Sequence, residues 1–230
     1  MIAIFCAEAE EAEAVRALLS ETKPLDFPWP AWQGQAGESE LVVVETGVGK
    51  VAAASAVAYL QACYQPEFAF FAGVAGALAE IPRGAVVIAS EAVQWDVDLS
   101  PLGRPRGELD SGERFIAPDP RLKKALLLAA GELDLPAYEA RVATGDAFLA
   151  DPAAAARLRQ EFGALAVEME GAAALWSAHR VGLAMALVRV VTDGADQAAP
   201  AGFNSFLEWA SARLAQVVLR AITKLPEKTS

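Results

Sequence analysis

The stretch from Ala186 to Asp196, A-L-V-R-V-V-T-D-G-A-D, limits the fold more than any other part of the chain. Its apolar, mostly β-branched residues fit a strand that is buried on both faces, as in sheets that carry helices on two sides. The run ends abruptly at Thr192, Asp193 and Gly194, so an acid stands at the carboxyl end of a core strand. Ligands bind at this edge of open α/β sheets, although an aspartate in such a position also caps turns.

The rest of the chain alternates between short apolar runs and amphipathic or alanine-rich segments. This order predicts a single domain over residues 1–230, an α/β/α three-layer sandwich of the α/β class with a central mixed sheet. The proline-containing and glycine-containing residues 22–40 are predicted to be irregular or to form a hairpin. We expect strands at residues 2–6, 41–45, 68–72, 86–89, 138–143, 164–167 and 184–191, and helices after residue 8 and at residues 51–63, 121–133, 152–162, 171–180 and 206–225.

The charge balance bears on the kind of partner. The chain has 19 basic and 30 acidic residues and a net charge of -11, which predicts repulsion of nucleic acids and anionic membranes. No apolar run is long enough to span a bilayer and no basic segment precedes the first strand, so we expect a cytoplasmic protein. Cys6 and Cys63 lie in apolar segments and are expected to be buried free thiols. A single histidine and two distant cysteines predict neither a metal site nor a cofactor.

Glu11 differs from the other glutamates that crowd the turn after the first strand. It shares a helix face with the apolar residues Val15 and Leu18, so its side chain is expected to point inward. In the first turn of a helix the macrodipole favours the ionised carboxylate, which is the form that a general base needs. Simple stabilisation of the helix start is the alternative explanation.

Two further acids, Glu168 and Glu170, follow the strand expected at residues 164–167. Because they are two residues apart, they project to the same side of an extended backbone. Two carboxylates at the mouth of a sheet are unfavourable unless donors such as sugar hydroxyls satisfy them. For Glu168, stabilisation of the following helix explains the acid equally well.

Two glycine-containing segments each follow a predicted strand. T-G-V-G-K at residues 46–50 matches neither the P-loop nor the dinucleotide fingerprint, so close packing of strand and helix explains it as well as a phosphate cradle does. G-V-A-G-A-L at residues 73–78 is predicted to be a turn whose small residues let a ligand or a second backbone approach. Residues 91–110 are predicted to form a long loop that serves a site or an interface.

Five motifs occur in the order that is typical of one enzyme superfamily. They are T-G-V-G-K-V-A-A at 46–53, G-V-A-G at 73–76, G-D-A-F at 145–148, V-E-M-E at 167–170 and R-V-V-T-D at 189–193. Together they resemble the purine nucleosidase and phosphorylase superfamily over nearly the whole chain, and in particular its methylthioadenosine/S-adenosylhomocysteine nucleosidases and futalosine hydrolases. The resemblance implies an enzyme that cleaves the bond between ribose C1′ and purine N9 without a cofactor.

The resemblance also implies roles for the acids. Glu11 corresponds to the base that activates the attacking water, and Asp193 to the acid that protonates purine N7. Glu170 corresponds to the acceptor of hydrogen bonds from the ribose 2′ and 3′ hydroxyls, with Glu168 beside it and Met169 packed beneath the sugar. These roles agree with the chemistry of N-glycosidic cleavage, in which carboxylates stabilise a cationic sugar and protonation helps the purine to leave.

Apolar and small residues complete the expected substrate site. Phe148 is expected to stack on the purine, the backbone at Leu149 to contact its edge, and Phe203 to line the site near the last helix. Val74 and Gly76 belong to a wall of small residues. Val74 occupies the position where methylthioadenosine nucleosidases generally have serine. The resemblance implies that this position is in the pocket for the 5′ substituent.

Water rather than phosphate is the expected nucleophile. C-A-E-A-E-E follows the first strand where phosphorylases of the superfamily have glycine and arginine, and its carboxylates repel a phosphate dianion.

The first helix resembles that of futalosine hydrolases. The main hypothesis is therefore hydrolysis of futalosine, which releases hypoxanthine in menaquinone biosynthesis. Futalosine carries a benzoate on its 5′ extension, and Arg104 or Arg106 is expected to supply the cation that binds it. The alternative is a methylthioadenosine/S-adenosylhomocysteine nucleosidase that releases adenine. A third hypothesis is a nucleoside-binding protein that has lost catalysis. The presence of both Glu11 and Asp193 argues against it, because a binding protein needs neither a base nor an acid. The resemblance also implies a homodimer in which residues 101–115 reach the neighbouring copy's site.

Overall fold

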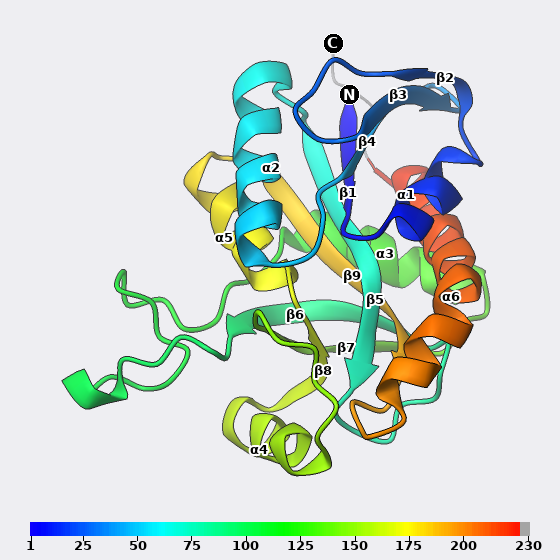
Figure 1. Cartoon of the computed structure of the whole chain (residues 1–230). Coiled ribbons are helices and arrows are strands. Elements are labelled where there is room, and N and C mark those ends of the chain that lie inside the picture. Colours follow the sequence, from blue (N-terminus) through cyan, green and yellow to red (C-terminus); the bar gives the residue numbers. More distant parts are fainter. Residues whose placement is uncertain (226–230) are drawn as a thin grey trace.

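The computed structural model describes residues 1–225, and these fold around a mixed sheet of nine strands (Figure 1). The strand order is β2-β3-β4-β1-β5-β8-β7-β6-β9, and β5 also pairs with β9, so the part of the sheet from β5 to β9 closes on itself. The predicted central mixed sheet is confirmed. The strands are β1 (Ile2–Cys6), β2 (Ser20–Pro24), β3 (Ala31–Ala36), β4 (Ser39–Glu45), β5 (Phe68–Ala77), β6 (Val86–Gln94), β7 (Ala137–Thr144), β8 (Ala164–Glu168) and β9 (Ala184–Asp193).

Helices cover the sheet on two sides and give the predicted three layers. In Figure 1, α2 and α5 lie on one side, and α1 and α6 lie on the other. Each side has its own hydrophobic core, and α3 packs with α6. None of the helices within residues 1–225 is long and apolar enough to cross a membrane. The helices are α1 (Ala9–Arg16), α2 (Lys50–Tyr64), α3 (Pro120–Glu132), α4 (Pro152–Phe162), α5 (Gly171–Arg180) and α6 (Ala199–Ile222), with a 3-10 helix η1 (Ser100–Leu102).

Strand β9 is buried on both faces, as its sequence predicts. Leu187 and Val191 belong to the core beneath α2 and α5, whereas Val188 and Val190 belong to the core beneath α1, α3 and α6. The strand therefore contributes side chains to both cores. Burial of each such side chain stabilises the fold by about 1.5–3 kcal/mol. Arg189, in the middle of the strand, is only 1% exposed and needs partners of opposite charge.

Of two predictions for glycine-containing segments, the hairpin alternative for residues 22–40 is confirmed, whereas the turn predicted at residues 73–78 is wrong. Residues 22–40 include most of β2 and all of β3, which pair antiparallel with each other, and β3 continues the sheet onto β4. The segment 73–77 is no turn but the second half of β5, which pairs with β9 as far as Gly76 and with β8 at Gly76 and Ala77. Glycine is disfavoured in strands in general, but pairing with β9 along this segment, and with β8 at its end, overrides this preference here.

Two further predictions need correction. Helix α6 begins at Ala199 rather than near Phe206, so Phe203 lies inside it; the proline at residue 200 is in the first turn, where its missing N–H is tolerated. Cys6 is buried as predicted, but Cys63 is exposed, because it faces outward on α2. Both are free thiols.

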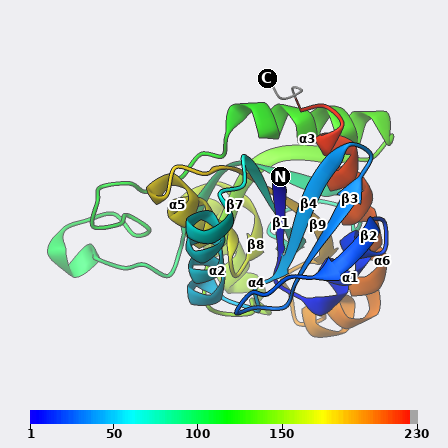
Figure 2. The same ribbon diagram turned by 90° about the horizontal axis from the view of Figure 1, so that it is seen from above.

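A long segment between β6 and α3 stands away from the body of the molecule. Residues 95–115, the arm, contain η1 and project sideways in both orientations (Figures 1 and 2). Strand β6 extends to Gln94, so the predicted loop begins later than residue 91. Leu102 in η1 is 77% exposed, so the arm presents an apolar side chain at its surface.

Candidate active site

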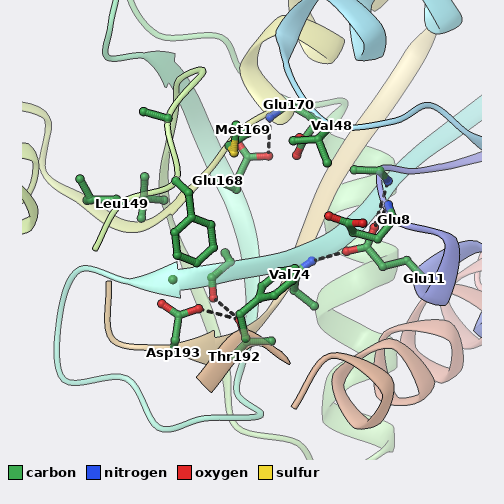
Figure 3. Close-up of a pocket in the computed structure, with 17 residues that line it drawn as sticks. Glu8, Glu11, Val48, Val74, Leu149, Glu168, Met169, Glu170, Thr192 and Asp193 are labelled. Atoms are coloured by element: carbon green, nitrogen blue, oxygen red, sulfur yellow. Dashed lines mark hydrogen bonds between the residues drawn. The ribbon is translucent and has the colours of Figure 1, made fainter. Parts of the chain in front are cut away.

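The ten residues that the sequence singles out line one cavity of about 350 Å³ at the edge of the sheet (Figure 3). This volume is within the range of sites for small molecules. The residues come from α1, β5, β8, β9, α6 and the connections after β7 and β8. They are Glu11, Val74, Gly76, Phe148, Leu149, Glu168, Met169, Glu170, Asp193 and Phe203, and the lining residues that sequence reasoning missed are Ala7, Glu8, Val48, Ala75, Ala147, Val167 and Thr192.

Glu11 is buried at one end of this cavity, in the first turn of α1. Its Oε2 accepts hydrogen bonds from the main-chain N–H of Ala7 (2.9 Å) and Glu8 (3.1 Å), and its Oε1 accepts one from Val74 in β5 (2.9 Å). Burial raises the pKa of Glu11 to about 7, although these N–H groups and Arg189 favour the charged form. A carboxyl group that titrates near neutral pH is suited to act as a general base.

Asp193 ends β9 at the other end of the cavity. Its Oδ1 accepts a hydrogen bond from the N–H of Ala195 (2.9 Å), and the Thr192 hydroxyl donates to its Oδ2 (2.9 Å). Figure 3 shows Val74 between Asp193 and Glu11. The neighbouring acid Asp196 is exposed and accepts a hydrogen bond from the N–H of Ala198, so it caps the following turn.

The glycines of β5 make room for these two carboxylates. A Cβ at Gly73 would lie 3.1 Å from Oε1 of Glu11, and one at Gly76 would lie 2.9 Å from Oδ1 of Asp193. Gly73 and Gly76 are three residues apart, so at about 3.3 Å per residue the two carboxylates are separated by roughly 10 Å along the strand. The glycines of G-V-A-G therefore allow the acidic side chains from α1 and β9 to lie close to the backbone of β5.

Glu168 is satisfied by protein donors. Its carboxylate accepts from the N–H of Gly171 (2.7 Å), from the Thr144 hydroxyl and from the guanidinium of Arg189. Arg189 and Glu168 form a buried ion pair, and removal of one partner of such a pair is strongly destabilising. Sequence reasoning gave Arg189 no role, although a cation within an apolar strand indicates buried carboxylate partners.

Glu170 precedes α5 and is also buried. Its Oε1 accepts from the N–H of Gly49 (2.8 Å), and its Oε2 lies 3.9 Å from Nη2 of Arg189. Burial and the neighbouring Glu168 raise the pKa of Glu170 to about 8. Donors from a sugar would favour the charged form of this carboxyl group and lower its pKa.

The remaining wall of the cavity is apolar. Phe148 and Phe203 meet edge to face, with ring centroids 5.7 Å apart, and Val48 and Met169 lie near Glu170 (Figure 3). Phe148 is 48% exposed and Val48 is 50% exposed. Exposed apolar side chains at the mouth of a cavity are suited to cover the flat, apolar faces of a ligand.

The glycine turn at residues 46–50 uses its N–H groups internally. Gly49 donates to Glu170, and Lys50 donates to Asp146 (2.8 Å). The start of α2 therefore binds carboxylates of the protein itself, which argues against the phosphate cradle.

Arg104 and Arg106 do not line the cavity. Arg104 pairs with Glu108 (3.0 Å) and Asp110 (3.1 Å) within the arm, and Arg106 pairs with Glu161 (3.0 Å). The expectation that one of them binds a benzoate finds no support in this geometry. Within residues 1–225, there is also no group of three or more acidic, histidine or cysteine side chains that could hold a metal ion.

Comparisons with known proteins agree with this geometry. The model of the phosphorylase superfamily matches residues 1–223. The chain belongs to this family. It is 32% identical to the 5′-methylthioadenosine/S-adenosylhomocysteine nucleosidase of Chromohalobacter salexigens, over 97% of both chains. The predicted superfamily and the predicted nucleosidase class of enzyme are thereby confirmed.

Solved structures include both nucleosidase types that the sequence resembles. The 5′-methylthioadenosine/S-adenosylhomocysteine nucleosidase of Neisseria meningitidis, in complex with methylthio-immucillin-A, has a TM-score of 0.94 and 29% identity, and the match covers 97% of this chain and 99% of that chain. The futalosine hydrolase of Helicobacter pylori has a TM-score of 0.92 and 28% identity, with 97% of both chains covered. The fold is common to both, so the substrate has to be inferred from the site.

Proposed function

We propose that this protein hydrolyses the N-glycosidic bond of 5′-thio-substituted adenine nucleosides, as methylthioadenosine/S-adenosylhomocysteine nucleosidases do. The observation that carries this choice is the lining of the cavity: apart from its acids, the residues that line it are apolar or small. Among the described lining residues there is no lysine or arginine. A thioether is matched by apolar walls, whereas the carboxylate of futalosine needs a cation.

The proposed mechanism assigns one task to each end of the cavity. Glu11 in its ionised form accepts a proton from water, and the oxygen of that water attacks ribose C1′. Asp193 donates a proton to N7, so that the bond from C1′ to N9 breaks and the purine leaves as a neutral base. Glu170 accepts hydrogen bonds from the ribose hydroxyls, and the ion pair with Arg189 holds Glu168 next to it.

The apolar residues bind the substrate in this proposal. Phe148 stacks on the purine, and the ring of Phe203 packs edge to face against the ring of Phe148. The backbone at Leu149 contacts the edge of the base. Met169 packs beneath the sugar. Val74 and Gly76 leave room along β5, and Val74 contributes an apolar surface for the 5′ group.

Water is supported as the nucleophile by the charges around Glu11. Glu8 lines the cavity next to it, and the nearest buried cation, Arg189, is engaged by Glu168. A phosphate dianion would meet carboxylates at this end without a free partner. Rates are therefore expected to be the same with and without added phosphate.

Futalosine remains the second candidate. The futalosine hydrolase structure covers the chain as fully as the Neisseria enzyme does, and Val74 departs from the serine of methylthioadenosine nucleosidases. The test is to give the purified protein methylthioadenosine, futalosine and aminodeoxyfutalosine in parallel and to identify the released base. Preferred release of adenine from methylthioadenosine supports the proposal, and preferred release of hypoxanthine from futalosine overturns it.

A homodimer is part of the proposal. The arm stands off the body, and the exposed Leu102 lies in η1, at its far end (Figures 1 and 2). A second copy that receives the arm would cover this leucine. Sedimentation is expected to give twice the mass of the chain, and a Leu102→Glu substitution is expected to weaken the association; a parent chain that sediments as a monomer contradicts the dimer.

A further inference from the structure

The loop at residues 145–149, between β7 and α4, carries the proposed purine contacts but has little packing of its own. Phe148 is half exposed, and Asp146 and Ala147 are exposed. Gly145 is fixed by its N–H, which donates to the carbonyl of Glu168 (3.1 Å), and by Trp95, whose indole leaves no room for a Cβ at residue 145. Leu149 packs against the core, but the exposed residues 146–148 need other contacts to hold them in place.

Asp146 binds two different elements at once. Its main-chain N–H donates to Oδ2 of Asp96, at the start of the arm (3.0 Å). Its own Oδ1 accepts from the main-chain N–H of Lys50, the first residue of α2 (2.8 Å). A carboxylate at a helix N-terminus is also favoured by the macrodipole.

Lys50 and Asp96 close the network. The ammonium group of Lys50 donates to Oδ1 of Asp96 (2.7 Å), and both side chains are less than one-third exposed. Three segments that are distant in the sequence therefore meet through three hydrogen bonds: the start of α2, the start of the arm and the loop at 145–149. The same helix start holds Glu170 through Gly49, so the acid proposed for ribose and the loop proposed for purine share one support.

We propose that Lys50, Asp96 and Asp146 form a positioning network that holds the loop at residues 145–149 in the place where it binds the purine. The inference rests on the proposed function, because a purine is the ligand expected at Phe148. Ion pairs at a surface add little to global stability, so the network is expected to act on ligand binding more than on unfolding. Its loss removes binding in the ground state and transition state alike, which raises KM and leaves kcat nearly unchanged.

The variants differ in which bonds they remove. Asp96→Ala removes the acceptor for both the N–H of residue 146 and the ammonium of Lys50, whereas Asp146→Ala removes only the acceptor for the N–H of Lys50. Lys50→Met keeps the main-chain bonds and loses only the ammonium group. We expect KM for methylthioadenosine to rise about tenfold in Asp96→Ala, about fivefold in Asp146→Ala and least in Lys50→Met, with kcat within about twofold of the parent.

Asp151→Ala is the matched control. Asp151 is exposed and lies two residues beyond the loop, where it caps α4 through the N–H of Ala153 (2.9 Å), so its removal weakens a helix start without touching the network. Loss of such a cap costs about 1 kcal/mol, which lowers the melting temperature. KM should stay at the parent value in this variant.

The experiment combines steady-state kinetics, melting temperature and calorimetric binding of adenine. The proposal predicts weaker adenine binding and higher KM in Asp96→Ala and Asp146→Ala, with melting temperatures no lower than that of Asp151→Ala. Parent values of KM and adenine affinity in both variants overturn it, as does an equal rise of KM in Asp151→Ala. If the parent binds adenine but does not cleave methylthioadenosine, the proposed function fails, and adenine binding still decides whether the network positions the loop.

Discussion

The two sides of the cavity are built in different ways. The side with the acids is built against the sheet: Glu11 in α1 and Glu168 in β8 are buried, and Asp193 ends a core strand. The glycines of β5 fit closely against the carboxylates of Glu11 and Asp193. The other side consists of the loop with Phe148 and the turn with Val48, which are half exposed. This difference suggests that the sheet fixes the chemistry, whereas the outer side selects and holds the substrate.

The largest effect is expected at the end of β9. Asp193→Asn keeps the size of the side chain but removes the proposed proton donor, so kcat is expected to fall by about 10²–10⁴-fold. Asp196→Asn, an amide at the exposed acid three residues later, is the control and should retain nearly full activity. Steady-state kinetics with methylthioadenosine measure both. Near-parent turnover in Asp193→Asn would remove the acid from the mechanism.

The second effect tests the close fit of the sheet side. Gly76→Ala adds a single carbon, which at 2.9 Å from Oδ1 must displace the carboxylate of Asp193. A displacement of about 1 Å costs on the order of 10²-fold in rate, and it should appear in kcat rather than in KM. Gly131→Ala on α3, where a Cβ meets no atom within 4 Å, is the matched control. If Gly76→Ala leaves kcat unchanged, the fit of β5 around the acid is not needed for catalysis.

The third effect belongs to the outer side. Phe148→Ala removes the proposed stacking surface for the purine, and stacking of a base on an aromatic ring contributes about 1–3 kcal/mol. KM should therefore rise by roughly tenfold or more, with a smaller change in kcat. Leu128→Ala on α3, at the same 48% exposure, controls for the loss of an exposed apolar side chain. A fall in kcat with an unchanged KM would contradict the division between the two sides.

Much of this division follows from the sequence alone. The acids stand directly after strands or in the first turn of a helix, so their positions follow from the expected elements. The extent of β5 does not, because glycine predicts a turn until the pairing with β9 is known. The roles of Glu168 and Arg189 are equally hidden, since each depends on a partner 21 residues away. The bonds of Asp146 to Asp96 and Lys50 likewise join segments that only the fold brings together.

The smallest effect is on stability as a function of pH. The pKa of Glu11 is raised to about 7 in the folded state from an ordinary value of 4.5, so the native protein holds a proton that the unfolded chain releases. The stability contributed by this group is present below about pH 4.5 and is lost as the pH rises to about 7. Glu11→Gln removes this dependence, so its melting temperature relative to the parent should increase between pH 5 and pH 8. Glu10→Gln changes an exposed acid of the same helix, and its melting temperature should follow that of the parent across this pH range. A melting-temperature difference between Glu11→Gln and the parent that does not change with pH would contradict the raised pKa.

The central claim is that Glu11 activates water while other residues bind the nucleoside. Its most direct test is Glu11→Gln at pH 7, with calorimetric binding of methylthioadenosine and single-turnover release of adenine measured on the same preparation. We expect methylthioadenosine to bind within a few-fold of the parent affinity and adenine to be released about 10²–10⁴-fold more slowly than by the parent. Adenine release at the parent rate by Glu11→Gln would contradict this claim.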